Sequence, residues 1–144
     1  MSTTSISLNL DSSDYSAQLS FQVVLNNCVV FATQHVTALT TITIAVDDVD
    51  AEHELKFVLT NKTQDHTTVD EQGNILSDAV LSVSDISFDG SKLGHMVFEQ
   101  TSYHHDTNGS AEMSQHEFYG TMGCNGYVSL KFATPMYIWL LENT

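Results

Sequence analysis

The chain has 144 residues, of which 42% are hydrophobic and only 15% charged, a composition typical of one globular domain and not of a disordered segment. Its 18 acidic residues are opposed by four lysines and no arginine, which gives a formal net charge of −14. That charge repels polyanions, and without arginine no bidentate contact to phosphates or bases can form, so nucleic acid and membrane insertion are not expected. The acidity either keeps the chain soluble or attracts divalent cations or a basic partner.

Alternation of apolar and polar residues predicts β-strands along most of the chain, because successive side chains of a strand face opposite sides. The alternating segments, in chain order, are residues 6–10, 19–23, 42–46, 55–59, 81–83, 86–88 and 128–132. Turn-forming pairs lie between them, among them Asn26-Asn27, Asp89-Gly90 and Asn125-Gly126. The pattern predicts an all-β fold, an antiparallel β-sandwich or jelly roll of about eight to ten strands, as a single domain over residues 1–144.

Two segments depart from simple alternation. Between residues 81–83 and 86–88 the phase slips by one residue at Ser84-Asp85, which predicts a β-bulge or a strand that changes sheets. The run 136–141 is apolar on both faces and far too short to span a membrane, so it predicts a strand that is central or buried in a subunit interface. A short helix is expected only near residues 110–115. The predicted interface residues are Tyr127, Tyr137, Trp139 and Leu141.

The sequence carries no catalytic motif, which predicts that the chain is not an enzyme. A nucleophile elbow of the form G-x-S-x-G, a Walker loop and an H-E-x-x-H zinc motif are all missing from it. A hydrolase that uses a carboxylate pair is the enzymatic alternative. Cys28 and Cys124 have no neighbouring base or cation and are predicted to be buried thiols. The first residues lack the features of a signal peptide, so synthesis in a reducing cytoplasm is expected.

Acidic residues gather at the predicted turns, and calcium is the cofactor that such a pattern suits. Calcium takes six to eight oxygen ligands, and loops at one end of a sandwich can supply them. The candidate ligands are Asp70, Glu71, Asp78 and Asp89. Their spacing is not that of an EF-hand, and ordinary acidic turn residues are the alternative interpretation.

Residues 101–115 form the one long polar segment and are predicted to be a loop. Tyr103, His104, His105 and Asp106 are its candidate partner-contact residues, with solvated histidines or a transition-metal site as alternatives. The phenylalanines that fall in step with aliphatic residues are predicted to lie in the core: Phe21, Phe57, Phe88 and Phe132. The tyrosines near turns either line a protein interface or stack on sugar rings: Tyr103, Tyr119, Tyr127 and Tyr137.

Four segments together carry a resemblance to known proteins: residues 68–75 and 86–94, each with a turn motif, and the C-terminal segments 126–128 and 134–143. They resemble small bacteriophage proteins, especially those from viruses of cyanobacteria and other aquatic bacteria. Those proteins look distantly like calcium-dependent xylan-binding carbohydrate-binding modules. The resemblance covers roughly residues 40–144 and implies a β-sandwich.

The leading hypothesis is a bacteriophage virion structural protein, a β-sandwich that decorates or cements the capsid or tail and contacts the host surface. Its partners would be other virion proteins and copies of itself in a homo-oligomer, and its location would be the virion after synthesis in the host cytoplasm. The alternative is a calcium-dependent carbohydrate-binding module, an adhesin that recognises host glycan. Stoichiometric co-purification with particles would favour the first, and glycan binding that a chelator abolishes would favour the second.

Overall fold

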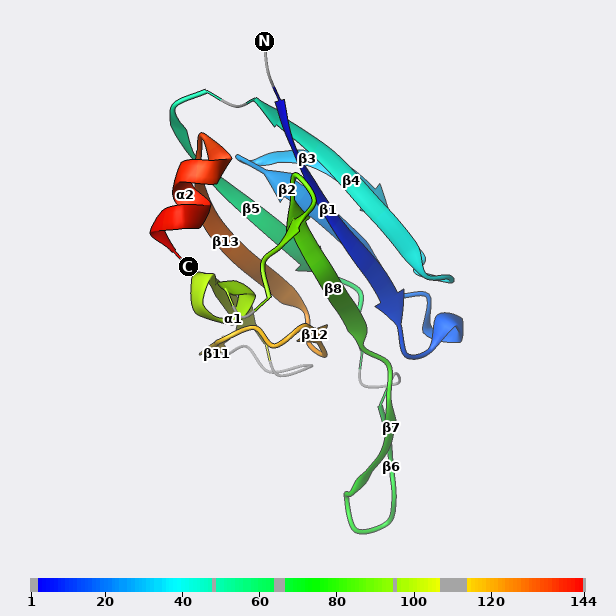
Figure 1. The fold of residues 1–144 in the computed structure, drawn as a ribbon. Coiled ribbons are helices and arrows are strands. Elements are labelled where there is room, and N and C mark those ends of the chain that lie inside the picture. The colour runs from blue at the N-terminus through cyan, green and yellow to red at the C-terminus, as the bar shows by residue number, and fades with distance from the viewer. Residues whose placement is uncertain (1–2, 48, 64–66, 95, 107–113, 144) are drawn as a thin grey trace.

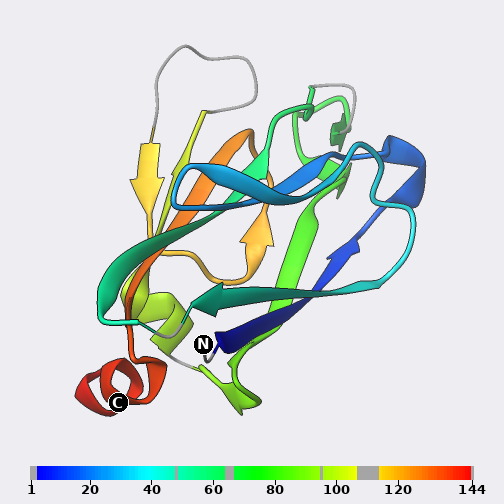
Figure 2. The same cartoon turned by 90° about the horizontal axis from the view of Figure 1, so that it is seen from above.

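The computed structural model describes residues 3–47, 49–63, 67–94, 96–106 and 114–143. Within them the chain forms two antiparallel sheets that pack face to face, and a two-stranded hairpin that projects away from both (Figure 1). Two short helices lie next to each other at one corner of the sandwich, as the view from above also shows (Figure 2). The predicted all-β sandwich is therefore confirmed. No helix in the described residues is long and apolar enough to cross a membrane.

The strands divide between the sheets without regard to chain order. The first sheet has the order β12-β8-β1-β4, with β9 also paired to β8: β1 Thr3–Ser12, β4 Thr40–Asp47, β8 Leu81–Phe88, β9 Ser91–Lys92 and β12 Thr121–Met122. The second has the order β11-β10-β13-β5-β2-β3: β2 Phe21–Leu25, β3 Cys28–Thr33, β5 Ala51–Leu59, β10 Thr101–His105, β11 Ser114–His116 and β13 Gly126–Thr134. The projecting hairpin is β6 Thr67–Val69 with β7 Ile75–Asp78. The helical segments are the 3₁₀ turn η1 Tyr15–Ala17, α1 Met96–Gln100 and α2 Met136–Glu142.

The core lies between the two sheets and is built from the alternating apolar residues. In β1 every second residue from Thr4 to Ser12 is buried, which is the period of a strand with one face on a core. The four phenylalanines predicted to be core residues are buried: Phe21, Phe57, Phe88 and Phe132. Phe88 of the first sheet and Phe132 of the second meet with ring centroids 5.3 Å apart, so aromatic packing joins the two layers.

Two of the predicted turns and the predicted bulge are also confirmed. Asn26 and Asn27 join β2 to β3 with φ of 50° and 67°, and Asp89 and Gly90 join β8 to β9 with φ of 50° and 84°. These positive values are those of the tight hairpin turns that Asn and Gly favour. In the pairing of β8 with β1 the register shifts between Ser7 and Asn9, and Asp85 has a φ of 52°. The phase slip in the sequence therefore marks a bulge.

The prediction of a C-terminal strand is wrong, because residues 136–142 form helix α2. Met136 and Trp139, three residues apart, are buried on one side of this helix. Trp139 lies 5.6 Å from Phe88 and 6.3 Å from Phe132, measured between ring centroids. Tyr137 and Leu141 are instead 64% and 74% exposed. A short, uniformly apolar run has no polar residues to distinguish a period of 2 from one of 3.6, so its pattern could not decide between strand and helix.

The predicted short helix near residues 110–115 is not confirmed, since residues 114–116 form strand β11 and residues 110–113 lie outside the described residues. The prediction that both cysteines are buried is wrong for Cys28, which is exposed at the start of the edge strand β3. Cys124 is partly exposed, and both thiols are free. Burial and the nearby Asp106 raise the pKa of the Cys124 thiol.

Because only the thiolate reacts, we expect a maleimide at neutral pH to label Cys28 well before Cys124. Mass spectrometry of the folded protein during labelling should show one fast and one slow modification per chain. The fast one should vanish in a Cys28→Ser variant, and loss of the slow one instead would contradict the assignment.

Candidate functional site

The four predicted calcium ligands do not come together. Asp70 lies at the tip of the β6–β7 hairpin and Asp78 at its base, where β7 ends. Asp78 precedes β8 and Asp89 follows it, so an eight-residue strand separates these two carboxylates by about 25 Å. Glu71 is exposed beside Asp70. Among the described residues no group of three or more His, Cys, Asp or Glu side chains could hold a metal ion, and the four predicted ligands are not brought together.

Two of the predicted calcium ligands, Asp70 and Asp89, make hydrogen bonds that stabilise the turns in which they lie. Asp70 accepts hydrogen bonds from the backbone N–H groups of Gln72 and Asn74, at 2.9 and 2.8 Å, and the bonds from Asn74 lower its pKa most. Asp89 accepts from the Thr4 hydroxyl and, at 2.6 Å, from the backbone N–H of Ser5, and these bonds lower its pKa. Acidic residues at turns were the alternative interpretation, and the hydrogen bonds agree with it.

The predicted contact loop is also misplaced in part, because Thr101–His105 form strand β10. Tyr103 is buried; its hydroxyl donates to the carbonyl oxygen of Cys124 at 2.5 Å, and burial raises its pKa to about 12. His105 is buried between the rings of Tyr103 and His116, at 4.5 and 4.8 Å. Their alternation in a strand explains why these two side chains point inward. Contact of His104 and Asp106 with a partner stays a prediction.

The predicted interface residues are also dispersed. Tyr137 and Leu141 are exposed on α2, whereas Trp139 is only 7% exposed and belongs to the core. Tyr127 lies on β13, far along the second sheet, and stacks on His104 with ring centroids 4.8 Å apart. The Lys56 ammonium lies 4.7 Å from the centre of the same ring. Their role in an interface is untested, but Trp139 is not available to a partner without unpacking the sandwich.

A groove along the partly unpaired edge of β8 gathers side chains suited to binding a small polar ligand. We call it the β8 groove; it has a volume of about 380 Å³ and is lined by residues 82–86, Lys92, Gly94 and residues 119–121. At one end the backbone N–H of Val83 donates to Gly120, and at the other the N–H of Leu93 donates to Ile86. Between these two contacts neither β12 nor β9 pairs with β8, so the strand edge is open there.

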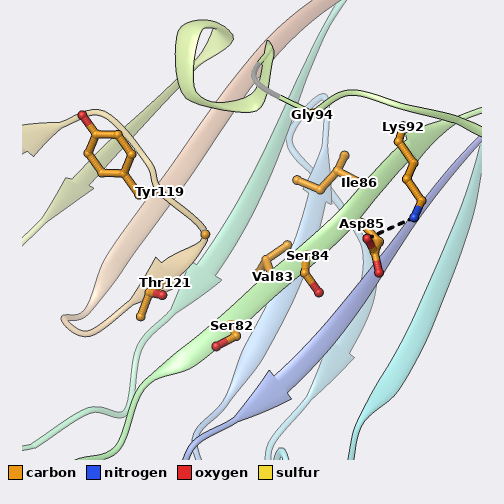
Figure 3. Close-up of a pocket in the computed structure, with 10 residues that line it drawn as sticks. Ser82, Val83, Ser84, Asp85, Ile86, Lys92, Gly94, Tyr119 and Thr121 are labelled. Atoms are coloured by element: carbon orange, nitrogen blue, oxygen red, sulfur yellow. Dashed lines mark ion pairs between the residues drawn. The ribbon is translucent and has the colours of Figure 1, made fainter.

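The two ends of the β8 groove differ in chemistry (Figure 3). Tyr119 stands at one end and is 66% exposed as a residue, and its hydroxyl donates to a Glu117 carboxylate oxygen at 2.6 Å, which raises the pKa of Tyr119. At the other end Lys92 Nζ lies 3.5 Å from Asp85 Oδ1. Ser84 lies between them, whereas Ser82 and Thr121, which pair across β8 and β12, lie farther along β8 from Asp85 (Figure 3).

The bulge explains why these groups line the groove. Asp85 adopts a positive φ, and the extra residue in β8 leaves both Ser84 and Asp85 exposed at the strand edge while Ile86 returns to the core. Asn9 of the neighbouring strand donates from Nδ2 to Asp85 Oδ2 at 3.0 Å and helps to orient this carboxylate. The sequence predicted the bulge and indicated Tyr119 as an interface or sugar-stacking residue. Nothing in it indicated that the bulge and Tyr119 would border the same groove.

Comparison with known proteins finds similarity only at the level of structure. No protein-family model matches the chain, and no curated protein matches it. The fold is similar to a solved structure of vCBM60 in complex with galactobiose, with a TM-score of 0.51 and 20% identity over 88% of this chain and 96% of that chain. It is also similar to the selenomethionine form of vCBM60, with a TM-score of 0.56 and 16% identity over 88% and 89% of the two chains.

The second of these structures is described as linking, by circular permutation, two families of calcium-dependent carbohydrate-binding modules. The fold of this chain is therefore similar to the β-sandwich of these two structures. At such low identity the similarity concerns the fold. The chemistry of this chain has to be argued from its own residues.

Proposed function

We propose that the chain is a carbohydrate-binding module that holds a glycan in the β8 groove and catalyses no reaction. The observation that carries the proposal is the exposed Tyr119 ring beside a row of hydroxyls and a charged pair, on a fold similar to that of a galactobiose-binding module. Sugar rings combine an apolar C–H face with a rim of hydroxyls. An aromatic face and a few placed polar groups are the two features that such a ligand requires.

Different residues of the β8 groove would make different contacts with the glycan. Tyr119 would stack on one sugar ring, while the hydroxyls of Ser84 and Thr121 donate to or accept from sugar hydroxyls. Asp85 and Lys92 would form charge-assisted hydrogen bonds to a neighbouring sugar. Their own ion pair is solvent-exposed and adds little to stability, so its atoms remain free to exchange partners.

Replacing Tyr119 by alanine is expected to lower glycan affinity by up to roughly tenfold, since an aromatic stacking contact contributes about 0.5–1.5 kcal/mol. Affinity gel electrophoresis against a panel of galactans, xylans and bacterial polysaccharides would find a ligand, and calorimetry would measure both proteins. Tyr15→Ala is the matched control: Tyr15 is also exposed, and its hydroxyl donates to Asp11 at 2.6 Å as that of Tyr119 does to Glu117. Equal affinity of the two variants would contradict the site.

A virion structural role stays a prediction, and two surface features favour attachment to another protein. Helix α2 exposes Tyr137, Ile138 and Leu141, and the projecting hairpin exposes Ile75 and Leu76. Exposed apolar groups of this kind are frequent in protein interfaces. Stoichiometric recovery of the chain in purified phage particles would test this role, and a decorating protein could carry the glycan site as well.

A further inference from the structure

Lys62 is a buried lysine whose ammonium is enclosed by oxygen atoms. Its side chain is inaccessible to solvent, and Nζ lies 2.6 Å from Asp78 Oδ1, 2.6 Å from the carbonyl oxygen of Ala79 and 2.9 Å from that of Gly123. An ammonium has three N–H donors, so each has an acceptor. Burial of a charge is costly unless it is paired and fully hydrogen-bonded, and this arrangement meets both conditions.

The three acceptors come from two segments that are distant in the sequence from each other and from Lys62. Lys62 follows β5, Asp78 ends β7 and Ala79 follows it before β8, and Gly123 directly follows β12. The backbone of Lys62 adds two bonds to the loop before β13: its N–H donates to Asn125 Oδ1 at 2.7 Å and its carbonyl accepts from Asn125 Nδ2 at 2.8 Å. One residue thus fastens three connections at the same end of the sandwich.

This is the coordination chemistry of a structural divalent cation. Calcium in proteins gathers loops through carboxylate and backbone carbonyl oxygens, which are the atom types around Nζ. A similar solved structure belongs to calcium-dependent modules, yet in the described part of this chain no cluster of metal-ligating side chains exists. Asp78, which the sequence suggested as a calcium ligand, is the ion-pair partner of Lys62. The described donor set therefore does not fit a calcium ion.

We propose that the Lys62 ammonium is a built-in structural cation that holds these loops together in place of a bound divalent ion. It also fixes one wall of the β8 groove, because Gly123 follows β12 and residues 119–121 precede or belong to it. The role of Lys62 at the groove rests on the proposed function, whereas its role in holding the loops together does not. Folding of this end of the sandwich should accordingly be independent of calcium.

The test is the melting temperature of the whole chain with millimolar CaCl2 and with excess EGTA. A ligand that binds the native state raises the melting temperature. Because we expect no calcium to bind, the two melting temperatures of the unmodified protein should agree within about 2 °C. Lys62→Met should lower the melting temperature by roughly 10 °C or more, because the partly buried carboxylate of Asp78 and two carbonyls lose their bonds to the ammonium. Lys131→Met, at an exposed lysine on β13, is the control and should change little.

Two results would overturn the proposal. One is that calcium raises the melting temperature of the unmodified protein by more than about 5 °C; the other is that Lys62→Met melts at the same temperature as Lys131→Met. If Lys62→Met does not fold, Asp78→Asn decides, because it keeps the lysine and removes only the carboxylate charge. Its melting temperature should fall by roughly 5 °C, and an unchanged value would refute the ion pair's role. No glycan enters these measurements, so failure of the Tyr119 test and failure of this one remain distinguishable.

Discussion

Gly126→Ala is expected to destabilise the chain by roughly 3 kcal/mol or more, combining a steric clash with an unfavourable backbone conformation. Gly126 begins β13 with a φ of 150°, and a Cβ atom there would lie 2.0 Å from the carbonyl oxygen of His104 and 2.6 Å from the Cα atom of His105. Both are backbone atoms of β10, the strand paired to β13. Relief of the clash would therefore separate two central strands of the second sheet.

Gly90→Ala is the matched control, since Gly90 also has a positive φ, of 84°, but a Cβ atom there would meet nothing within 4 Å. Only the conformational term remains, and we expect a cost of about 1 kcal/mol. Urea denaturation followed by circular dichroism gives both free energies of unfolding. If the two variants lost the same stability, the close approach of β13 to β10 would be wrong.

The fold was predictable because its signals are local. Each strand needs only alternation, as in β1, and each turn needs only two residues, as in Asn26-Asn27 and Asp89-Gly90. The bulge at Ser84-Asp85 was predictable for the same reason, because a change of phase is visible within eight residues. The order of the strands was not, since it depends on contacts between segments such as β12 and β8 that are about forty residues apart.

The site was less predictable because its parts are brought together only by the fold. Tyr119 and Lys92 border one groove through the separate attachment of their segments to β8. The calcium-ligand prediction relied on acidic residues at turns, and these have a second explanation. Asp70 and Asp89 accept hydrogen bonds that stabilise the turns in which they lie, and in the sequence an acidic turn residue cannot be distinguished from an acidic metal ligand. Nothing in the sequence indicated that Lys62 is a buried ion-pair partner, since its acceptors are a carboxylate 16 positions away and two backbone carbonyls.

Trp139→Ala is expected to cost about 3 kcal/mol, because the indole ring fills the space against Phe88 and Phe132 and its removal leaves a cavity. The same substitution at Tyr137 or Leu141 should change stability by less than about 0.5 kcal/mol, since both are largely exposed. Far-UV circular dichroism is the suitable probe for all three, because Trp139 is the only tryptophan and its fluorescence disappears with it.

These three variants also separate a helix from a strand at the C-terminus. In a strand, residues 137, 139 and 141 share one face, so their substitutions would have effects of similar size. In helix α2, Met136 and Trp139 share the buried face, and Met136→Ala should therefore be costly where Tyr137→Ala is not. Emission of Trp139 at short wavelength in the native protein, moving to long wavelength in urea, would agree with its burial. If alanine at Tyr137, Trp139 and Leu141 instead lowered the free energy of unfolding by large and equal amounts, the result would support the predicted strand, with all three side chains buried on one face.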